Sequence, residues 1–234
     1  MSTRPRIVAF VPIKRESERL PNKNFLLLGG LPLYGHILRT LTATPAIDDV
    51  YLFTSAPRGL FELPKGVQYL QKDEQNNRPM GIIREFCMKV ASDLYVLAHA
   101  TTPFTRRETL EHAIAEVSTG RHDSALPVER INTFAWCGAR PVNYDPNSVP
   151  KTQEIEPVLI ETSGFYLFER SLALKDSRRV GYRPLFCEVS FPETIDIDYL
   201  WQFNLAELHI QHSSECDGTS DEGQLGKQDG GRAR

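Results

Sequence analysis

The chain has 234 residues and a formal net charge of −3 at pH 7, with 41% hydrophobic and 24% charged residues. This length fits one α/β domain with a substantial apolar core, whereas two full domains would be cramped. The slightly negative charge offers no general attraction to a polyanion, so no nucleic-acid surface is expected. No stretch approaches the roughly 18 continuous apolar residues of a membrane span, and no signal-peptide core opens the chain, so we expect a cytoplasmic protein without membrane contact.

Segments of strand character alternate with segments of helical period through the first half of the chain. The unbroken run of β-formers at residues 6–13 is typical of a strand buried on both faces. The further expected elements are a helix after Pro32, strands at 50–54 and 67–70, a helix opening near Pro79, a strand at 94–98 and a helix begun by a Thr105–Glu108 capping box. Because parallel strands need crossover connections, this order predicts a mostly parallel sheet flanked by helices.

The pattern changes in the second half of the chain. Residues 125–190 read as short strands, at 124–128, 133–136, 158–168 and 185–189, separated by prolines. We interpret this region as an inserted β-rich arm and a candidate dimer contact. Apolar positions at 200–210 predict a closing helix, and the polar composition of residues 213–234 predicts a disordered tail. The expected organisation is one domain over residues 1–212 followed by that tail.

A positively charged loop, residues 14–24, directly follows the first predicted strand. Open parallel sheets bind ligands beyond the carboxyl ends of their strands, so the loop has the favoured position for a ligand contact. It carries four basic and two acidic side chains in a protein that is negative overall. Such donors can pair with phosphate oxygens in a partly desolvated cleft. A solvated surface loop is the alternative interpretation.

The order of this loop, Lys-Arg-Glu-Ser-Glu-Arg-Leu-Pro-Asn-Lys-Asn, resembles the signature loop of the CMP-sialic acid and CMP-KDO synthetases, a family of cytidylyltransferases. The positions that match are Lys14, Ser17, Pro21, Lys23 and Asn24. The resemblance implies a nucleotide-diphospho-sugar transferase-like fold and a loop that wraps the triphosphate of CTP. The implied nucleotide contacts are Lys14, Arg15, Ser17, Arg19, Lys23 and Asn24, of which Lys14, Arg19 and Lys23 are implied to be catalytic.

The loop also departs from the family pattern. The usual loop is rich in glycine between its first basic residue and its serine, which lets backbone N–H groups approach phosphate closely. Charged residues fill that stretch here. Side chains would therefore replace some of the backbone contacts.

Two aspartates, Asp196 and Asp198, lie two residues apart after a strand-like stretch, so both carboxylates project to the same side of an extended backbone. Two clustered carboxylates suit Mg²⁺, which takes oxygen ligands from one or two carboxylates and from substrate phosphates. Capping of the last helix by Asp198 is the structural alternative. The Ile-Asp-Ile-Asp sequence resembles the metal-binding motif of the same family, which implies that both aspartates hold the metal.

The end of the 94–98 strand provides a candidate base pocket. Residues 97–104, Leu-Ala-His-Ala-Thr-Thr-Pro-Phe, resemble the family segment Leu-Gln-Pro-Thr-Ser-Pro, whose glutamine helps to read cytosine. The resemblance implies nucleotide contacts by His99, Thr101 and Thr102. An imidazole cannot reproduce the paired donor and acceptor of a carboxamide. UTP is therefore an alternative nucleotide substrate to CTP. A hydrogen-bonded structural histidine is the alternative for His99.

Two other segments, residues 151–157 and 161–168, resemble the acceptor-binding segments of the family. Polar side chains near them and in the 72–78 loop are suited to bind an acidic acceptor, and ordinary surface polarity is their alternative role. The candidate acceptor-binding residues are Asn76, Asn77, Arg78, Lys151, Gln153, Thr162, Ser163 and Gly164.

The resemblance extends over about residues 6–211. It implies transfer of CMP from CTP to a 2-keto-3-deoxy sugar acid such as an acylneuraminate, with release of pyrophosphate, by a homodimer. Some relatives that make CMP-phosphonates have a glycine-poor loop with Glu-Arg-Leu-Pro, so a phosphonate acceptor is the alternative. The replaced glycines and His99 also leave open a nucleotide-binding protein without catalysis.

Overall fold

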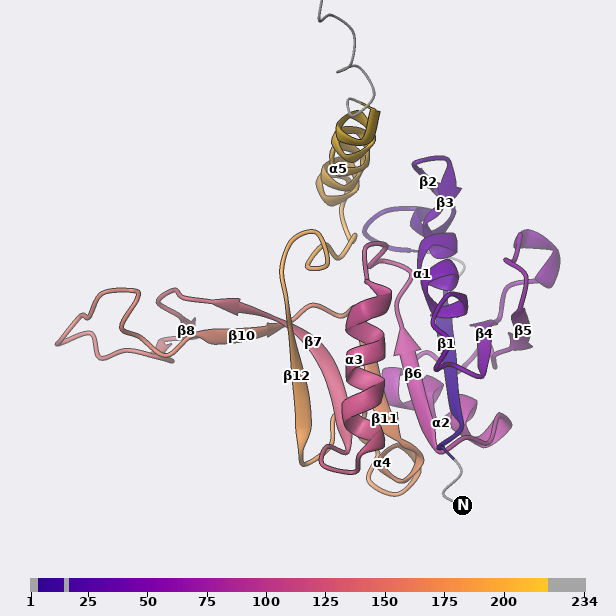
Figure 1. Cartoon of the computed structure of the whole chain (residues 1–234), viewed down its shortest axis with the longest axis horizontal. Helices are drawn as coiled ribbons and strands as arrows, with labels where there is room; N and C mark the ends of the chain where they lie inside the picture. The colour runs from indigo at the N-terminus through magenta and orange to yellow at the C-terminus, as the bar shows by residue number, and fades with distance from the viewer. Residues whose placement is uncertain (1–3, 15–16, 219–234) are drawn as a thin grey trace, which may run out of the picture.

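The computed structural model describes residues 4–14 and 17–218, which fold around an eight-stranded mixed sheet (Figure 1). Its parallel half contains β6 (Leu94–Ala98), β1 (Ile7–Ile13), β4 (Asp49–Thr54) and β5 (Val67–Gln71), in that spatial order. β1 is buried along nearly its whole length, as its apolar run indicates. The predicted mostly parallel sheet is therefore confirmed.

The other half of the sheet is built by strands that the sequence assigned to the arm. β11 (Phe165–Glu169) lies antiparallel between β6 and β7 (Ser124–Ile131). β12 (Pro184–Val189) pairs parallel with β7. β10 (Val158–Glu161) pairs antiparallel with the carboxyl end of β7. The expected arm over residues 125–190 was thus too wide. β7 and β11 have consecutive buried residues on both faces, so they belong in a covered sheet.

The projecting part of this region is smaller. Figure 1 shows β10 and the short strand β8 (Trp136–Cys137) extending away from the body of the molecule. A second short strand, β9 (Arg140–Pro141), pairs with β8. We call residues 132–157 the arm. The Asn143 amide holds its two sides together, because it donates to the carbonyl oxygens of Thr133 and Glu156 at 2.9 and 2.8 Å.

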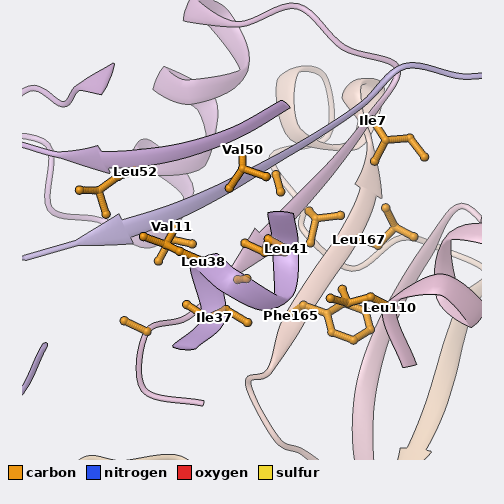
Figure 2. Close-up of a cluster of buried hydrophobic side chains, with 14 of the residues drawn as sticks. Ile7, Val11, Ile37, Leu38, Leu41, Val50, Leu52, Leu110, Phe165 and Leu167 are labelled. Atoms are coloured by element: carbon orange, nitrogen blue, oxygen red, sulfur yellow. The ribbon is translucent and has the colours of Figure 1, made fainter. Parts of the chain in front are cut away.

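Helices cover both faces of the sheet. α1 (Leu33–Thr42) and α3 (Arg107–Ser118) pack on one face, and α2 (Pro79–Lys89) and α4 (Arg170–Leu174) pack on the other. Figure 2 shows the first of these cores, in which apolar side chains of α1 meet alternate residues of the central strands. The labelled members are Ile7, Val11, Ile37, Leu38, Leu41, Val50, Leu52, Leu110, Phe165 and Leu167.

A third apolar cluster joins the start of the chain to its last helix, α5 (Leu200–Gly218). It packs Phe203 of α5 against a small hairpin made of β2 (Leu27–Leu28) and β3 (Leu31–Pro32). The hairpin turns at Gly29 and Gly30, whose φ angles of 55° and 80° favour glycine. Two short 3₁₀ helices, η1 (Lys23–Phe25) and η2 (Arg58–Leu60), complete the elements.

The carboxyl-terminal helix is longer than its sequence pattern indicated. α5 continues to Gly218, so residues 213–218 are helical where a disordered tail was expected. The remainder of the expected tail, residues 219–234, lies outside the described residues. None of the helices in the described ranges has the length and apolarity needed to cross a membrane.

Candidate active site

A cavity of about 380 Å³ lies at the carboxyl ends of β1 and β6. Its floor includes Pro12 and Leu97, and two apolar residues of α2, Ile82 and Ile83, close it from the side. The remaining lining residues are polar or small: Lys14, Ser17, Glu18, Arg19, Lys23, Asn24, Lys72, Asn77, His99, Ala100, Thr101 and Arg179, with Ile13 and Pro79. The cavity therefore occupies the edge of the sheet where a parallel arrangement places ligands.

The loop after β1 forms one wall of this cavity. Asn24 is buried and its side-chain amide donates to the Lys14 carbonyl oxygen at 3.2 Å, which ties the two ends of the loop together. The loop turns through Asn22, whose φ of 54° is left-handed. Four predicted phosphate-binding residues, Lys14, Ser17, Arg19 and Lys23, line the cavity together with Asn24. Arg15 lies outside the described residues.

The loop meets the aspartate pair directly. The Lys23 ammonium contacts the Asp198 carboxylate at 2.6 Å and donates to the Ile197 carbonyl oxygen at 3.0 Å. The Arg19 guanidinium contacts the second Asp198 oxygen at 2.5 Å. The N–H groups of Asp198 and Tyr199 at the start of α5 donate to the Gln202 side chain, at 2.8 Å each. The Asp198 carboxylate is therefore turned toward the loop.

The Asp196 carboxylate has different surroundings. Burial raises its pKa above the ordinary value, and the Asp198 charge adds to this, although a hydrogen bond from Thr101 opposes it. Its Oδ1 atom is buried and has no hydrogen-bond partner within the described residues. Such an orphaned oxygen is unusual in a folded protein and is suited to a bound cation.

These two carboxylates fit Mg²⁺. No group of three or more His, Cys, Asp or Glu side chains suited to a metal gathers within the described ranges. Magnesium needs only one or two carboxylates when substrate phosphates supply other ligands. Asp196 offers a free oxygen, and Asp198 offers two that now contact Arg19 and Lys23.

Two contacts fasten the aspartate segment to the chain between β6 and α3 and to α3 itself. The Ile197 N–H donates to the Thr101 carbonyl oxygen at 2.8 Å. Glu193 is buried, and its carboxylate accepts the Arg106 N–H at 2.9 Å and the Thr109 hydroxyl at 2.9 Å. Glu193 thus binds the amino end of α3 from a distant part of the chain.

The predicted Thr105–Glu108 capping box is wrong. Arg106 is the N-cap of α3 and makes no side-chain cap bond, and the Thr105 hydroxyl donates to the Thr102 carbonyl oxygen at 3.1 Å. Glu108 is exposed, with an ion pair to Arg107. The Glu193 carboxylate provides the bonds that a local cap would otherwise make.

His99 lies in the cavity wall between the loop and β11. Its Nδ1 is 2.6 Å from the Ser163 carbonyl oxygen, which can only accept, so Nδ1 carries the proton and Nε2 is an acceptor. Burial lowers the His99 pKa below its ordinary value despite this hydrogen bond. Thr101 also lines the cavity. Thr102 does not, because it is fully buried and its hydroxyl donates to the His99 carbonyl oxygen at 2.9 Å.

Of the three candidate acceptor residues in the 72–78 loop, one lines the cavity and two do not. Asn77 lines the cavity, whereas Arg78 is exposed outside it. The Asn76 amide instead donates to Glu85 of α2 at 2.8 Å. Asn76 therefore anchors the loop on α2.

The other candidate acceptor residues lie outside the lining of the cavity. Ser163 has a φ of 62° and presents its carbonyl oxygen to His99. The Thr162 hydroxyl donates to Pro127, and Gly164 packs closely against Pro127. The exposed residues Lys151 and Gln153 belong to the arm.

Two cations in the cavity were not identified from the sequence. Lys72 is 3% exposed and donates to the carbonyl oxygens of Asp73 and Asn76 at 2.6 and 2.7 Å. Its place directly after β5, at the carboxyl end of a parallel strand, was a usable signal. Arg179 lies between α4 and β12, and no local pattern marks it.

The chain belongs to the cytidylyltransferase family, whose model matches residues 8–156. The matched part contains β1, its charged loop, the base-pocket candidates and most of the arm. The aspartate pair follows the matched part.

Individual relatives agree with this assignment. N-acylneuraminate cytidylyltransferase A of Danio rerio is 23% identical over 218 residues, which cover 87% of this chain and 50% of that protein, so the chain spans about half the length of this relative. The CMP-N,N'-diacetyllegionaminic acid synthase of Legionella pneumophila is 23% identical over 233 residues, covering 90% of this chain and 99% of that protein.

Solved structures share the fold. The structure of CMP:2-keto-3-deoxy-manno-octonic acid synthetase complexed with CTP superposes with a TM-score of 0.68 at 16% identity, covering 89% of this chain and 99% of that one. The predicted resemblance to the CMP-sialic acid and CMP-KDO synthetases and the predicted fold are therefore confirmed.

Proposed function

We propose that the chain is a CTP-dependent cytidylyltransferase that joins CMP to a 2-keto-3-deoxy sugar acid, such as an acylneuraminate, and releases pyrophosphate. The observation that carries this proposal is the contact of Lys23 and Arg19 with Asp198, beside the unpaired Oδ1 of Asp196. This arrangement places a candidate cation site against Arg19 and Lys23, two of the cations that line the cavity; the two aspartates themselves are not among its lining residues. The names of the relatives given above specify sugar acids as their acceptors, which supports the choice of acceptor for this chain.

The basic loop has a defined part in the reaction. Lys14, Arg19 and Lys23 bind the triphosphate oxygens, and the incoming phosphates replace Asp198 as the partner of Arg19 and Lys23. A hydroxyl oxygen of the acceptor then loses its proton to solvent and forms a bond to the α-phosphorus in line, while the bond from that phosphorus to the bridging oxygen breaks and pyrophosphate leaves with that electron pair. The loop supplies positioning and charge stabilisation.

The released Asp198 and the unpaired oxygen of Asp196 would hold Mg²⁺. The metal would neutralise charge that develops on the departing pyrophosphate. Next to them, the Nε2 atom of His99 offers a hydrogen-bond acceptor to the base or to the acceptor. The homodimer remains part of this proposal, with the arm as its contact.

The test is pyrophosphate release by the purified chain with CTP, MgCl₂ and one acceptor at a time. We expect turnover with N-acetylneuraminate or 2-keto-3-deoxy-manno-octonic acid, and less turnover when UTP replaces CTP. Turnover with 2-hydroxyethylphosphonate alone would replace the sugar acid by a phosphonate, the second candidate that the glycine-poor loop favours. CTP binding without turnover of any acceptor would contradict the proposal and favour a nucleotide-binding protein without catalysis.

A further inference from the structure

Arg179 reaches the cavity from the side opposite the phosphate-binding loop. It lies in the connection between α4 and β12, and its side chain lines the cavity. The guanidinium carbon lies 3.8 Å from the ring centre of Tyr166, at the start of β11, and Nη2 donates to the Tyr166 hydroxyl at 2.9 Å. The stacked ring and the hydrogen bond fix the guanidinium in one orientation.

The connection that carries Arg179 is itself anchored. The Asp123 carboxylate is buried and accepts the N–H groups of Tyr182 and Arg183 at 2.8 and 3.1 Å. A Cβ atom at Gly181 would overlap this carboxylate, so only glycine lets the backbone pass so closely. The connection that carries Arg179 therefore has a defined conformation, fixed by Asp123.

Most of the hydrogen-bonding capacity of Arg179 is unused within the described residues. A guanidinium has five N–H donors, and here the Tyr166 hydroxyl accepts one of them. Arg179 Nη2 also forms a long ion pair, at 3.5 Å, with Glu161, whose side chain is 49% exposed. The Tyr166 hydroxyl also donates to Glu161 at 2.6 Å, so this carboxylate is shared. Arg179 retains charge and donors for a ligand in the cavity.

The register of the sheet gives the separation between β11, which carries Tyr166, and β1, which leads into the loop. Phe10 of β1 pairs with Leu97 of β6, and Leu97 pairs with Tyr166 of β11, so the three residues form one row. Neighbouring strands lie about 4.8 Å apart, which puts the Tyr166 backbone roughly 10 Å from the strand that leads into the loop. His99 directly follows β6, the strand between them, and lines the same cavity as Arg179 and the loop. The cavity therefore extends from the loop, past His99, to Arg179.

We propose that Arg179 binds an acidic oxygen group of the acceptor and thereby selects anionic acceptors. This inference rests on the proposed cytidylyltransferase function, which it deepens on the acceptor side. A fixed, stacked guanidinium with free donors matches the two oxygens of a carboxylate or phosphonate better than a flexible ammonium does. Carboxylate and phosphonate groups both present negatively charged oxygens. The assay distinguishes them because each acceptor is tested separately.

The first test compares Arg179→Gln and Arg179→Lys with the wild-type chain in the pyrophosphate assay. We expect Arg179→Gln to raise the acceptor KM by about 10- to 100-fold, because a charged hydrogen bond is lost. The KM for CTP should change less than twofold. Arg179→Lys should recover part of the effect. Arg183→Gln is the matched control, since Arg183 is exposed on the same connection and does not line the cavity.

A second arm uses an acceptor whose acidic group is blocked, such as the carboxamide of the sugar acid that is turned over. The wild-type chain and Arg179→Gln should then have similar KM values. An unchanged acceptor KM in Arg179→Gln, beside an active wild-type chain, would overturn this inference alone. Absence of pyrophosphate release from the wild-type chain with every acceptor would overturn the proposed function itself.

Discussion

At the scale of single residues, the Asp198 carboxylate occupies the place that phosphate oxygens take in the proposed reaction. It contacts both Lys23 and Arg19, the two cations assigned to the triphosphate. The side chain of Arg19 is 55% exposed and that of Lys23 13%, so solvent screens the Arg19 pair with Asp198 more than the Lys23 pair. The exchange of partners by Arg19 during nucleotide binding therefore has a low cost.

Asp198→Asn should lower kcat/KM for CTP by at least about 100-fold, because a metal ligand is lost while the side-chain volume is kept. Thermal unfolding should change little, since partly exposed ion pairs contribute about 1 kcal/mol or less. Pyrophosphate release and a melting curve measure the two effects on one sample. Near-normal rates would remove Asp198 from the proposed metal site.

Asp196 gives a separate prediction about metal binding. Its buried, unpaired oxygen is a cost in the ligand-free fold, so Asp196→Asn should unfold at the same or a higher temperature. The wild-type chain should gain about 2.7 kcal/mol when CTP and Mg²⁺ are present at 100 times their apparent Kd. In Asp196→Asn, the additional effect of Mg²⁺ over CTP alone should disappear. A persisting Mg²⁺ effect would place the ion elsewhere.

At the scale of elements, the site depends on one long-range attachment. Glu193 binds the amino end of α3 through Arg106 and Thr109, and the aspartate pair follows it by three and five residues. The same carboxylate also contacts the Arg106 side chain at 2.9 Å. The geometry of the candidate metal ligands is thus coupled to a helix that lies outside the cavity.

Glu193→Gln should lower the free energy of unfolding by about 1–3 kcal/mol, because the partly buried donors Arg106 and Thr109 lose a charged acceptor. Turnover should also fall, since the aspartate segment loses its attachment. Glu108→Gln is the matched control, because Glu108 is 68% exposed in the same helix. Denaturant unfolding of both variants provides the comparison, and equal stabilities would show that the attachment is unimportant.

At the scale of the whole molecule, the arm exposes apolar side chains that the body of the chain leaves uncovered. Trp136, Val142 and Val149 are 51%, 57% and 62% exposed. Exposed apolar residues on a projecting segment are suited to a contact surface. This is consistent with the proposed homodimer.

Trp136→Glu should shift the chain from dimer to monomer at micromolar concentration, because a charge replaces an apolar contact. Sedimentation velocity measures the change directly. Trp201→Glu is the control, since Trp201 is 64% exposed on α5, away from the arm. A dimer that survives Trp136→Glu would argue against the arm as its contact.

The sequence predicted those parts of the fold that depend on local patterns. The apolar run of β1 and the apolar face of α1 are short-range signals, and both elements formed where expected. The place of β11 between β6 and β7 was not predictable, because it depends on pairing between distant segments. The range predicted for the arm, residues 125–190, therefore included strands of the central sheet.

The same distinction applies to the candidate site. The basic loop and the aspartate pair have compact sequence patterns, and the structure brings Lys23 and Asp198 together. Glu193 accepts the Arg106 N–H from 87 residues away in the sequence, so it has no local signature. Arg179 lies in an irregular connection whose sequence pattern does not mark it. Among the candidate acceptor residues, only Asn77 lines the cavity within the described ranges.

The third apolar cluster has a consequence for how the protein is made. It joins Leu28 and Leu33, which follow the charged loop, to Ile195, Ile197 and Phe203 near the other end of the chain. During translation, β1, β4, β5 and β6 emerge from the ribosome well before this cluster can close. The nascent chain can thus form the parallel half of its sheet early, while the region of the charged loop and the aspartate segment are joined only when α5 arrives.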